Sequence, residues 1–231
     1  MAKAKALLLT NGGHARLPNN LALLADIFAR QAQLNIQISD DHSEMSRERL
    51  RDYDLILDYS GYSEKEPTDD QLNAVMEAVE AGTPYIGLHV ASLPFRSQLE
   101  YKKEAGGVWP ANPAPSLLLN ETQLRYFTMV GSVFLTHSPI KKFTLHLLDS
   151  NHPITQGVTD FEIEDEIYDV AADWTKRQVL AEAEGYPLLY THQWGKGKVH
   201  YNALGHDQRA FANPANQRLL IQAVAWALAE A

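Results

Sequence analysis

Apolar residues occur along the first 90 positions in short runs, separated by turn residues and by segments with helical spacing. Residues 4–10 form a continuous run, residues 53–59 and 84–88 are further short segments centred on apolar residues, and residues 34–39 alternate between apolar and polar. Continuous apolar runs of this length are typical of strands buried on both faces of a parallel sheet. Between the runs, apolar residues recur every three or four positions, which predicts amphipathic helices. The alternation of strands and helices predicts a doubly wound, mostly parallel α/β sheet with right-handed crossovers.

Several helix ends are marked by capping residues. Thr68-Asp69-Asp70-Gln71 has the pattern of a capping box, in which the Thr hydroxyl and the Gln amide satisfy backbone donors reciprocally. Asn19 or Asn20 is expected to cap the first helix. Asn213 precedes a proline, a combination typical of a cap followed by the first helical position. These signals predict where three of the helices begin.

The second half of the chain has a less regular pattern. Residues 106–115 are rich in glycine and proline, which predicts a loop, and we expect this loop to cover the site. Residues 116–126 are expected to form a short helix. Strands are predicted at 142–148, 161–170 and 179–183, and a β-hairpin at 187–193 and 198–204 around Trp194-Gly195-Lys196-Gly197, where the glycines permit positive φ. In the strand at 161–170, Ile163 and Ile167 would face the core, while Glu166 and Tyr168 on the opposite face would point towards a site or towards water.

Length and composition narrow the class of protein. The 231 residues fit one domain, residues 1–231, of ordinary size. The net charge is −9 and the 20 Lys and Arg residues are scattered, which argues against nucleic acids and anionic membranes as partners. There is no cysteine, so disulfides, thiolate nucleophiles and Cys-ligated zinc are excluded. The apolar run at 6–9 is too short for a signal peptide or a membrane span, and a cytoplasmic location is expected. The oligomeric state stays open, with a homo-oligomer as one option.

The segment around His89 is the first candidate for chemistry. A short buried strand, 84–88, runs into Gly87-Leu88-His89-Val90-Ala91-Ser92. This layout matches a nucleophile elbow, in which small neighbours allow a sharp turn that carries one functional group clear of the sheet. Here an imidazole stands at the apex instead of Ser or Cys. The usual covalent chemistry is therefore excluded at this position, although a structural histidine that only bonds across the turn is an equal alternative.

Four histidines follow strands or lie in glycine-containing turns: His14, His89, His137 and His206. Ligands of open α/β sheets bind at the carboxyl ends of the strands, so we expect these side chains to meet in one crevice. Because imidazoles gain and lose a proton near neutral pH, a cluster of them suits general acid and base chemistry on a hydroxylated or carbonyl substrate. Alternatively, the cluster with Glu166 or Asp207 could bind a divalent metal through three nitrogens and one oxygen. No local H-E-x-x-H spacing supports the metal, and the cofactor stays unknown.

Motifs spread over nearly the whole chain resemble the ThuA-like family, the trehalose-utilisation proteins. They are Gly87-Leu88-His89, Gly131-Ser132-Val133-Phe134 with Thr136-His137, His152-Pro153-Ile154-Thr155-Gln156-Gly157, Asp165-Glu166-Ile167-Tyr168, Gly195-Lys196-Gly197-Lys198-Val199 through Leu204-Gly205-His206-Asp207, and Trp226-Ala227. The resemblance implies a flavodoxin-like fold of the class I glutamine amidotransferase type, with His89 in the position of the catalytic cysteine. It also implies a role in carbohydrate metabolism on a trehalose-type disaccharide or a keto-sugar. The proline-rich loop at 109–115 departs from the family and leaves the substrate open.

These observations lead to three hypotheses. In the first, a sugar-modifying enzyme uses His89 and His137 as acid and base, His206 oriented by Asp207, and Glu166 as a further carboxylate. His14, Tyr168 and Trp109 would contact the carbohydrate, Trp109 by stacking on a sugar ring or, alternatively, by anchoring its own loop. In the second, the chain is a sugar-binding or regulatory protein that has the fold but no catalytic activity. In the third, it is a metal-dependent hydrolase. A Cys-dependent amidotransferase is excluded in each.

Overall fold

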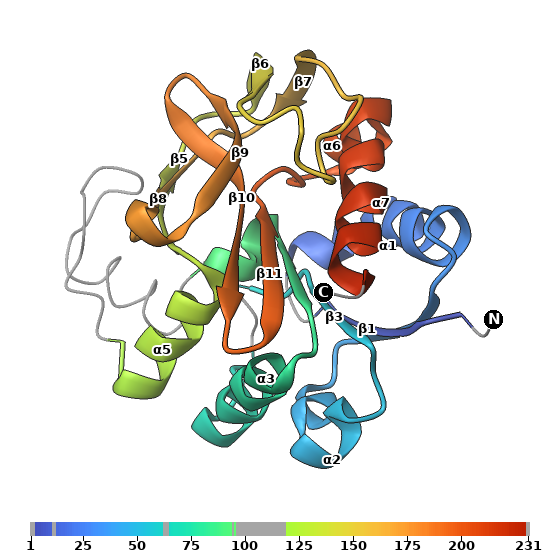
Figure 1. Cartoon of the computed structure of the whole chain (residues 1–231), viewed down its shortest axis with the longest axis vertical. Helices are drawn as coiled ribbons and strands as arrows, with labels where there is room; N and C mark the ends of the chain where they lie inside the picture. Colours follow the sequence, from blue (N-terminus) through green and yellow to red (C-terminus); the bar gives the residue numbers. More distant parts are fainter. Residues whose placement is uncertain (1–2, 11–12, 62–64, 94, 96–118, 230–231) are drawn as a thin grey trace.

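The computed structural model describes residues 3–10, 13–61, 65–93, 95 and 119–229. Its main sheet has nine strands in the order β2-β1-β3-β4-β11-β10-β9-β6-β7 (Figure 1). The parallel part consists of β2 (Asn35–Ser39), β1 (Lys5–Leu9), β3 (Leu55–Asp58), β4 (Tyr85–Leu88) and β11 (Gly197–Asn202). With β11 as the fifth strand, this is the 2-1-3-4-5 order of flavodoxin-like folds. The predicted fold class is confirmed.

The remaining strands extend this sheet in antiparallel fashion. They are β10 (Tyr186–Trp194), β9 (Gln178–Ala183), β6 (Lys141–Leu147) and β7 (Phe161–Asp165). The predicted hairpin is present as β10 and β11, and it supplies the fifth parallel strand. A separate two-stranded sheet pairs β5 (Val133–His137) with β8 (Tyr168–Ala171). The assignment of residues 1–231 to a single domain stays a prediction.

Helices cover both faces of the parallel strands. Figure 1 shows α1 (Asn20–Ala25) and α7 (Pro214–Leu228) on one side, and α3 (Asp69–Ala81) and α5 (Glu121–Val130) on the other. The shorter helices are α2 (Arg47–Leu50), α6 (Gln208–Ala212), the π-helical η2 (Asp26–Gln31) and the 3₁₀ turns η1 (His14–Arg16), η3 (His42–Met45), η4 (His89–Ser92) and η5 (Trp174–Lys176). Strands β3 and β4 are buried throughout, as their continuous apolar runs predict.

The helix caps agree with the sequence at two of three places. Thr68 and Gln71 form the capping box of α3, and Asn213 accepts bonds from the first backbone N–H groups of α7. At α1 the prediction is wrong. Asn19 lies in the left-handed region and its side chain makes no capping bond, while the side chain of Asn20 turns inward to other partners.

The predicted strand at 161–170 is interrupted. Strand β7 ends at Asp165 and β8 begins at Tyr168, and the two belong to different sheets. The carboxylate of Asp165 accepts a bond from the backbone N–H of the next residue, Glu166. A side chain that bonds the adjacent backbone competes with the ladder, which explains why pairing stops here. The helix expected at 116–126 also differs, because α5 runs from Glu121 to Val130.

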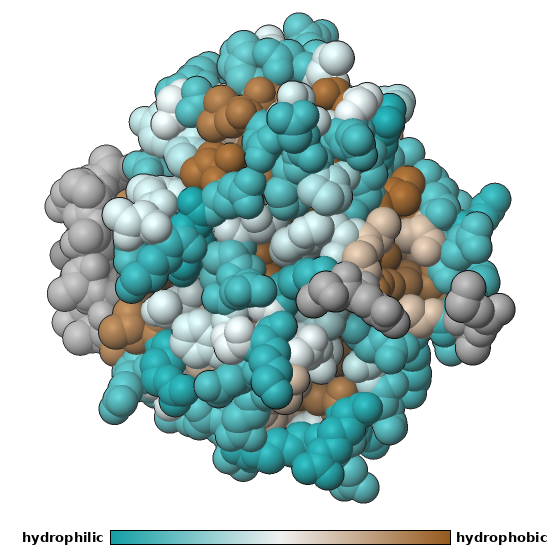
Figure 2. Space-filling view, in the orientation of Figure 1, coloured by the Kyte–Doolittle hydropathy of each residue, from teal (hydrophilic) through white to brown (hydrophobic). Residues whose placement is uncertain are grey.

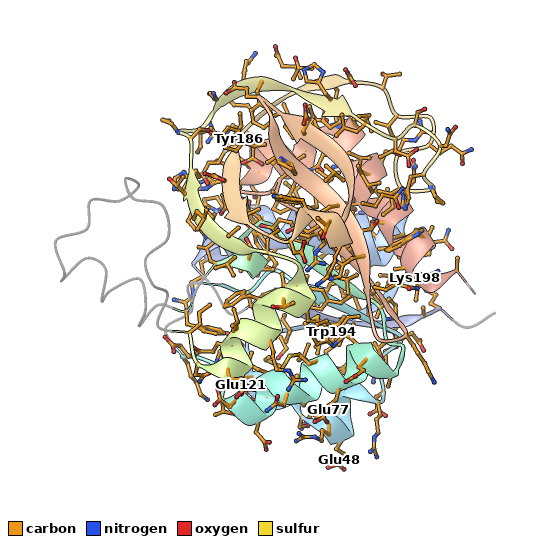
Figure 3. The ribbon with its side chains drawn as sticks, turned by 60° about the vertical axis from the view of Figure 1, so that its left-hand side comes forward. Glu48, Glu77, Glu121, Tyr186, Trp194 and Lys198 are labelled. Atoms are coloured by element: carbon orange, nitrogen blue, oxygen red, sulfur yellow. The ribbon has the colours of Figure 1, made fainter. Side chains whose placement is uncertain are left out.

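The surface is mostly hydrophilic on the face seen in Figure 2, where apolar residues form separate patches. Figure 3 shows α3 and α5 side by side, with Glu77 and Glu121 on their outer faces. Lys198 donates from its Nζ to the carbonyls of Trp226 and Ala229 near the end of α7. Within the described part of the chain, no helix has the length and apolar character needed to cross a membrane.

Candidate active site

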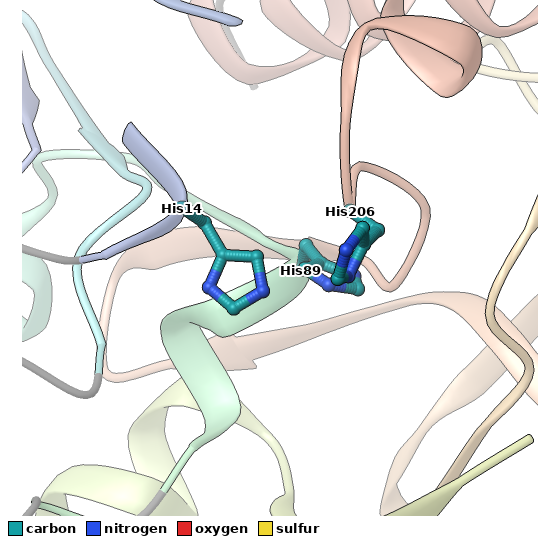
Figure 4. A group of neighbouring side chains, drawn as sticks. All are labelled: His14, His89 and His206. Atoms are coloured by element: carbon teal, nitrogen blue, oxygen red, sulfur yellow. The ribbon is translucent and has the colours of Figure 1, made fainter. Parts of the chain in front are cut away.

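Three loops at the carboxyl ends of parallel strands bring His14, His89 and His206 together (Figure 4). His14 begins the turn η1 after β1, His89 follows β4 directly, and His206 follows β11. The ring centroids lie 4.9 Å apart for His14 and His206, 5.3 Å for His14 and His89, and 5.7 Å for His89 and His206. Three of the four predicted histidines therefore lie together at the carboxyl edge of the sheet.

His89 occupies a strained turn. Its φ is +40°, a conformation that costs a non-glycine residue about 1–3 kcal/mol unless the surroundings enforce it. The surroundings do so here, because the hydroxyl of Tyr201 donates to the carbonyl of His89 at 2.6 Å and lies 2.7 Å from Ser92 Oγ. Gly87 is needed next to this turn, since a Cβ there would meet Tyr201 and Ala91 at 3.2 Å. The elbow predicted from the sequence is thus present in its backbone geometry.

The imidazole of His89 is fully buried, and both of its nitrogens have partners. Nδ1 lies 2.6 Å from the carbonyl oxygen of Ala203. Because a carbonyl only accepts, the ring proton sits on Nδ1 and Nε2 carries the lone pair. Nε2 then accepts a bond from the hydroxyl of Tyr168 at 2.8 Å. Burial, reinforced by the nearby His14, lowers the pKa of His89 well below its usual value, so the ring is neutral.

Glu166 stands between three of the predicted histidines. Its Oε1 lies 3.1 Å from Nδ1 of His137, and its Oε2 lies 3.2 Å from Nδ1 of His206 and 3.6 Å from Nε2 of His89. The carboxylate is almost completely buried. The pairing of β5 with β8 sets His137 opposite Tyr168, and this small sheet delivers His137 to the site. The contact with Glu166 raises the pKa of His206.

His14 packs against the rings of His89 and His206. Burial, followed by the proximity of His206, lowers the pKa of His14 to about 4. Its Nδ1 is buried, and among the described residues it has no hydrogen-bond partner. The ring therefore presents a neutral nitrogen to the interior of the site.

Two residues that the sequence did not single out hold the loops of His14 and His206 together. The side-chain amide of Asn20 donates to the carbonyl of His14 at 3.0 Å and to the carbonyl of His206 at 3.3 Å. It also donates to the hydroxyl of Tyr59 at 3.0 Å, which in turn donates to the carbonyl of Gly205 at 2.7 Å. The sequence offered only a buried-strand pattern for Tyr59 and a helix-cap pattern for Asn20. Neither pattern predicts that these side chains connect two loops that are distant in sequence.

Asp165 supports the same turn from the opposite side. Its carboxylate accepts from the backbone N–H of Gly205 at 2.7 Å and of His206 at 3.2 Å. Burial raises the pKa of Asp165 to about 7, although these bonds oppose the rise. Asp165 is buried and lies on the same side of β7 as Ile163.

The expected pairing of His206 with Asp207 is wrong. Asp207 caps the short helix α6 through the N–H of Arg209 and binds the guanidinium of the same residue. The carboxylate in contact with the His206 ring is Glu166. Adjacency in sequence misled here, since consecutive residues in an extended segment point in opposite directions.

Tyr168 reaches the site as predicted, whereas Trp109 lies outside the described residues. Three of the other histidines have partners elsewhere: His146 pairs with Asp160 at the surface, His192 bonds Met129, and His200 bonds Tyr190. Any metal bound in the cluster would have nitrogen ligands from His14, His89 and His206, which each offer one nitrogen within 4.8 Å of the others.

Comparison with known sequences gives a match to one family. The sequence profile of the ThuA family, described as trehalose utilisation, matches residues 5–227. No curated protein matches the chain.

Several solved structures have the same fold. A ThuA-like protein from Parabacteroides merdae superposes with a TM-score of 0.72 at 18% identity, covering 98% of this chain and 90% of that one. A cytoplasmic protein from Salmonella typhimurium has a TM-score of 0.64 at 12% identity, covering 97% and 98%. A protein described as a GMP synthase component from Thermoplasma acidophilum has a TM-score of 0.55 at 13% identity, covering 97% and 94%. At these identities the likeness concerns the fold alone.

Proposed function

The chain belongs to the ThuA family of trehalose utilisation, and from this premise we propose that it is an enzyme of carbohydrate metabolism. Its substrate is a trehalose-type disaccharide or a keto-sugar derived from one, and the reaction proceeds by proton transfer at histidine side chains. The observation that carries the proposal is the position of Glu166 between His137, His206 and His89.

The proton-transfer groups must be accessible to the substrate, which distinguishes the histidines from one another. About a quarter of the side chain of His137 and of His206 is exposed, whereas that of His89 is fully buried. We therefore assign the direct roles to His137 and His206, and give His89 a positioning role. This assignment replaces the sequence-based expectation that His89 acts as acid or base.

His137 is the proposed base. Its Nδ1 lies 2.8 Å from the carbonyl oxygen of Ser138 and 3.1 Å from Glu166 Oε1, so the proton of the neutral ring belongs on Nδ1 and the lone pair on Nε2. A carboxylate behind an imidazole fixes the tautomer and stabilises the imidazolium that forms when the ring takes a proton. In the proposed reaction, Nε2 takes a proton from a hydroxyl or from carbon next to a carbonyl.

His206 supplies the complementary positive charge. Its pKa is raised by the contact with Glu166, so the protonated form is more populated than it is in a free imidazole at the same pH. An imidazolium beside the substrate can donate a proton to an oxygen or stabilise charge that develops on it. His14 lies beside His206, with ring centroids 4.9 Å apart, and would contact the sugar, whereas Tyr168 is buried and would act through its bond to His89.

Turnover of trehalose and of 3-keto sugars by the purified full chain tests this proposal. His137→Ala and Glu166→Gln should each lower kcat by about 10²-fold or more, the range of one acid or base group. His146→Ala is the matched control, because His146 also contacts a carboxylate but lies at the surface, and it should retain full turnover. Activity that survives both site substitutions contradicts the mechanism. Saturable sugar binding with no product would instead identify a sugar-binding or regulatory protein.

The proposal also covers the partner, the assembly and the cellular location of the protein. The net charge of −9 disfavours nucleic acids and anionic membranes, so the proposed partner is a small carbohydrate, and a homo-oligomer is one option for the assembly. A cytoplasmic location agrees with the description of the Salmonella typhimurium protein of the same fold.

A further inference from the structure

We propose that His14, His89 and His206 bind a divalent transition-metal ion, with Zn²⁺ as the best-suited cation. One nitrogen from each ring lies within 4.8 Å of the other two, and the rings converge from three different loops (Figure 4). Imidazole nitrogens suit zinc and its first-row neighbours, and three protein ligands with one open position are typical of catalytic zinc sites. The proposal goes beyond sugar chemistry, because the ion would bind whether or not the protein turns over a sugar.

The spacing of the rings is close to what a metal requires. Zinc to nitrogen bonds of about 2.0–2.1 Å in a tetrahedron separate the nitrogens by about 3.3 Å. Nitrogens that lie up to 4.8 Å apart would therefore have to approach each other by up to about 1.5 Å. Side-chain rotations of His14 and His206 can supply this movement, because both lie on loops beyond the strand ends, while His89 stays fixed by its buried turn.

The groups behind the rings match those of metal-binding histidines. Such histidines donate their second nitrogen to a backbone carbonyl or a carboxylate, which fixes the tautomer and the ring orientation. His89 directs Nδ1 to the carbonyl of Ala203 at 2.6 Å. Nδ1 of His206 lies 3.2 Å from Oε2 of Glu166, within ion-pair distance but without the geometry of a hydrogen bond. With Nδ1 next to these groups in both rings, Nε2 is the nitrogen that would bind the ion.

His14 contributes an independent observation. Its Nδ1 is buried without a hydrogen-bond partner among the described residues. A buried polar atom without a partner costs about 1–3 kcal/mol, so such an atom in a cluster needs an explanation. A cation bound at Nδ1 explains it, because coordination would supply the missing partner of that atom.

The ion would place positive charge close to Glu166, because the ring of His206 lies 3.2 Å from that carboxylate. In the ion-free protein the hydroxyl of Tyr168 donates to Nε2 of His89, and this bond must open for the ion to bind. His137 and Glu166 would still be available for proton transfer, and a sugar oxygen or water would take the fourth position.

Titration of the tag-free full chain with Zn²⁺ and Co²⁺ after chelator treatment tests the site. Calorimetry should give one ion per chain, and bound Co²⁺ should show the strong visible absorption of tetrahedral coordination. His14→Asn and His206→Asn should each weaken binding by about 10²-fold or more, in line with the sensitivity of metal sites to their histidines. His146→Asn should bind as the unmodified chain does, and circular dichroism should show all three variants folded.

The outcomes separate this inference from the proposed function. The metal site is overturned if the chelator-treated chain binds neither Zn²⁺ nor Co²⁺. It is also overturned if the affinity for the ion is unchanged in both His14→Asn and His206→Asn. If sugar turnover persists in that case, the proposed function stands without it. If one ion binds as expected and no sugar is turned over, the metal site stands and the proposed function fails.

Discussion

The hydroxyl of Tyr168 donates a hydrogen bond of 2.8 Å to Nε2 of His89, and the two rings lie 4.3 Å apart. Tyr168 begins β8 in the small sheet, whereas His89 follows β4 in the large one. The bond therefore ties the two sheets together at the site. Since Nδ1 of His89 bonds Ala203, the imidazole is neutral, fully bonded and unable to rotate.

Replacing Tyr168 by Phe should destabilise the protein while leaving the tautomer of His89 unchanged. The substitution leaves Nε2 of His89 buried without a donor, which costs about 1–3 kcal/mol of unfolding free energy. The proton should stay on Nδ1 because Ala203 still accepts it, and nitrogen NMR of the imidazole can show this. Tyr53→Phe is the control, since that hydroxyl bonds Glu44 away from the histidines. A proton found on Nε2 in the variant would contradict the tautomer assignment.

Asn20→Leu should loosen the candidate site although Asn20 touches neither a substrate nor a catalytic imidazole. The variant keeps the size of the side chain but loses the donors to the carbonyls of His14 and His206 and to Tyr59. Those buried acceptors cost about 1–3 kcal/mol when left unpaired. We expect sugar turnover and zinc affinity to fall by at least tenfold, since both depend on the relative position of His14 and His206.

The control for Asn20→Leu is Asn213→Leu, which removes the side-chain amide that caps α7. Loss of a cap costs about 0.5–2 kcal/mol, so both variants lose stability. Only Asn20→Leu should change the site at a temperature where both are folded. Equal effects of the two on zinc affinity would mean that Asn20 acts through general stability alone.

The fold could be predicted from the sequence because its information is local. Continuous apolar runs identified β1, β3 and β4, the capping box located the start of α3, and the glycines of the hairpin located the turn between β10 and β11. The rule that parallel strands present ligands at their carboxyl ends then brought His14, His89 and His206 to one place before their distances were known.

The partners of these histidines could not be predicted, because they depend on directions that sequence spacing does not give. Asp207 follows His206 but turns towards Arg209, while Glu166 arrives from a different part of the chain. The break after Asp165 that directs Glu166 inward comes from a side-chain bond to the neighbouring backbone. Asn20 has the composition of a helix cap, and only the tertiary structure shows that its amide joins two site loops.

Gly205→Ala should cost more stability than glycine substitutions at open turns. Gly205 has φ +139°, and a Cβ there would lie 2.8 Å from Cζ of Phe211 and 3.3 Å from Cβ of His89. Backbone strain of this kind costs about 1–3 kcal/mol, and the steric contact adds to it. Gly185→Ala is the matched control, because φ there is +85° and nothing lies within 4 Å of the added Cβ. Urea unfolding of both variants measures the difference, and equal losses would contradict the steric argument.

His200→Phe should make the stability of the protein less sensitive to acid. His200 is fully buried, its Nδ1 bonds the carbonyl of Tyr190, and burial lowers its pKa to about 3. In the unfolded chain the pKa is about 6.5. As the pH falls from 6.5 towards 3, the unfolded chain therefore binds a proton at this position and the folded chain does not. By linkage, His200 removes about 1.4 kcal/mol of unfolding free energy for each pH unit well inside this window.

Between pH 6.5 and pH 4.5 the unmodified protein should thus lose about 2 kcal/mol that His200→Phe does not lose. The measurement is the difference in unfolding free energy between the two proteins at each pH, which cancels the titration of all other groups they share. Any constant packing cost of the phenyl ring shifts this difference equally at both pH values and leaves its slope unaffected. His146→Phe serves as the control, because His146 lies at the surface beside Asp160. If both variants change the slope alike, burial of His200 is not the cause of the acid sensitivity.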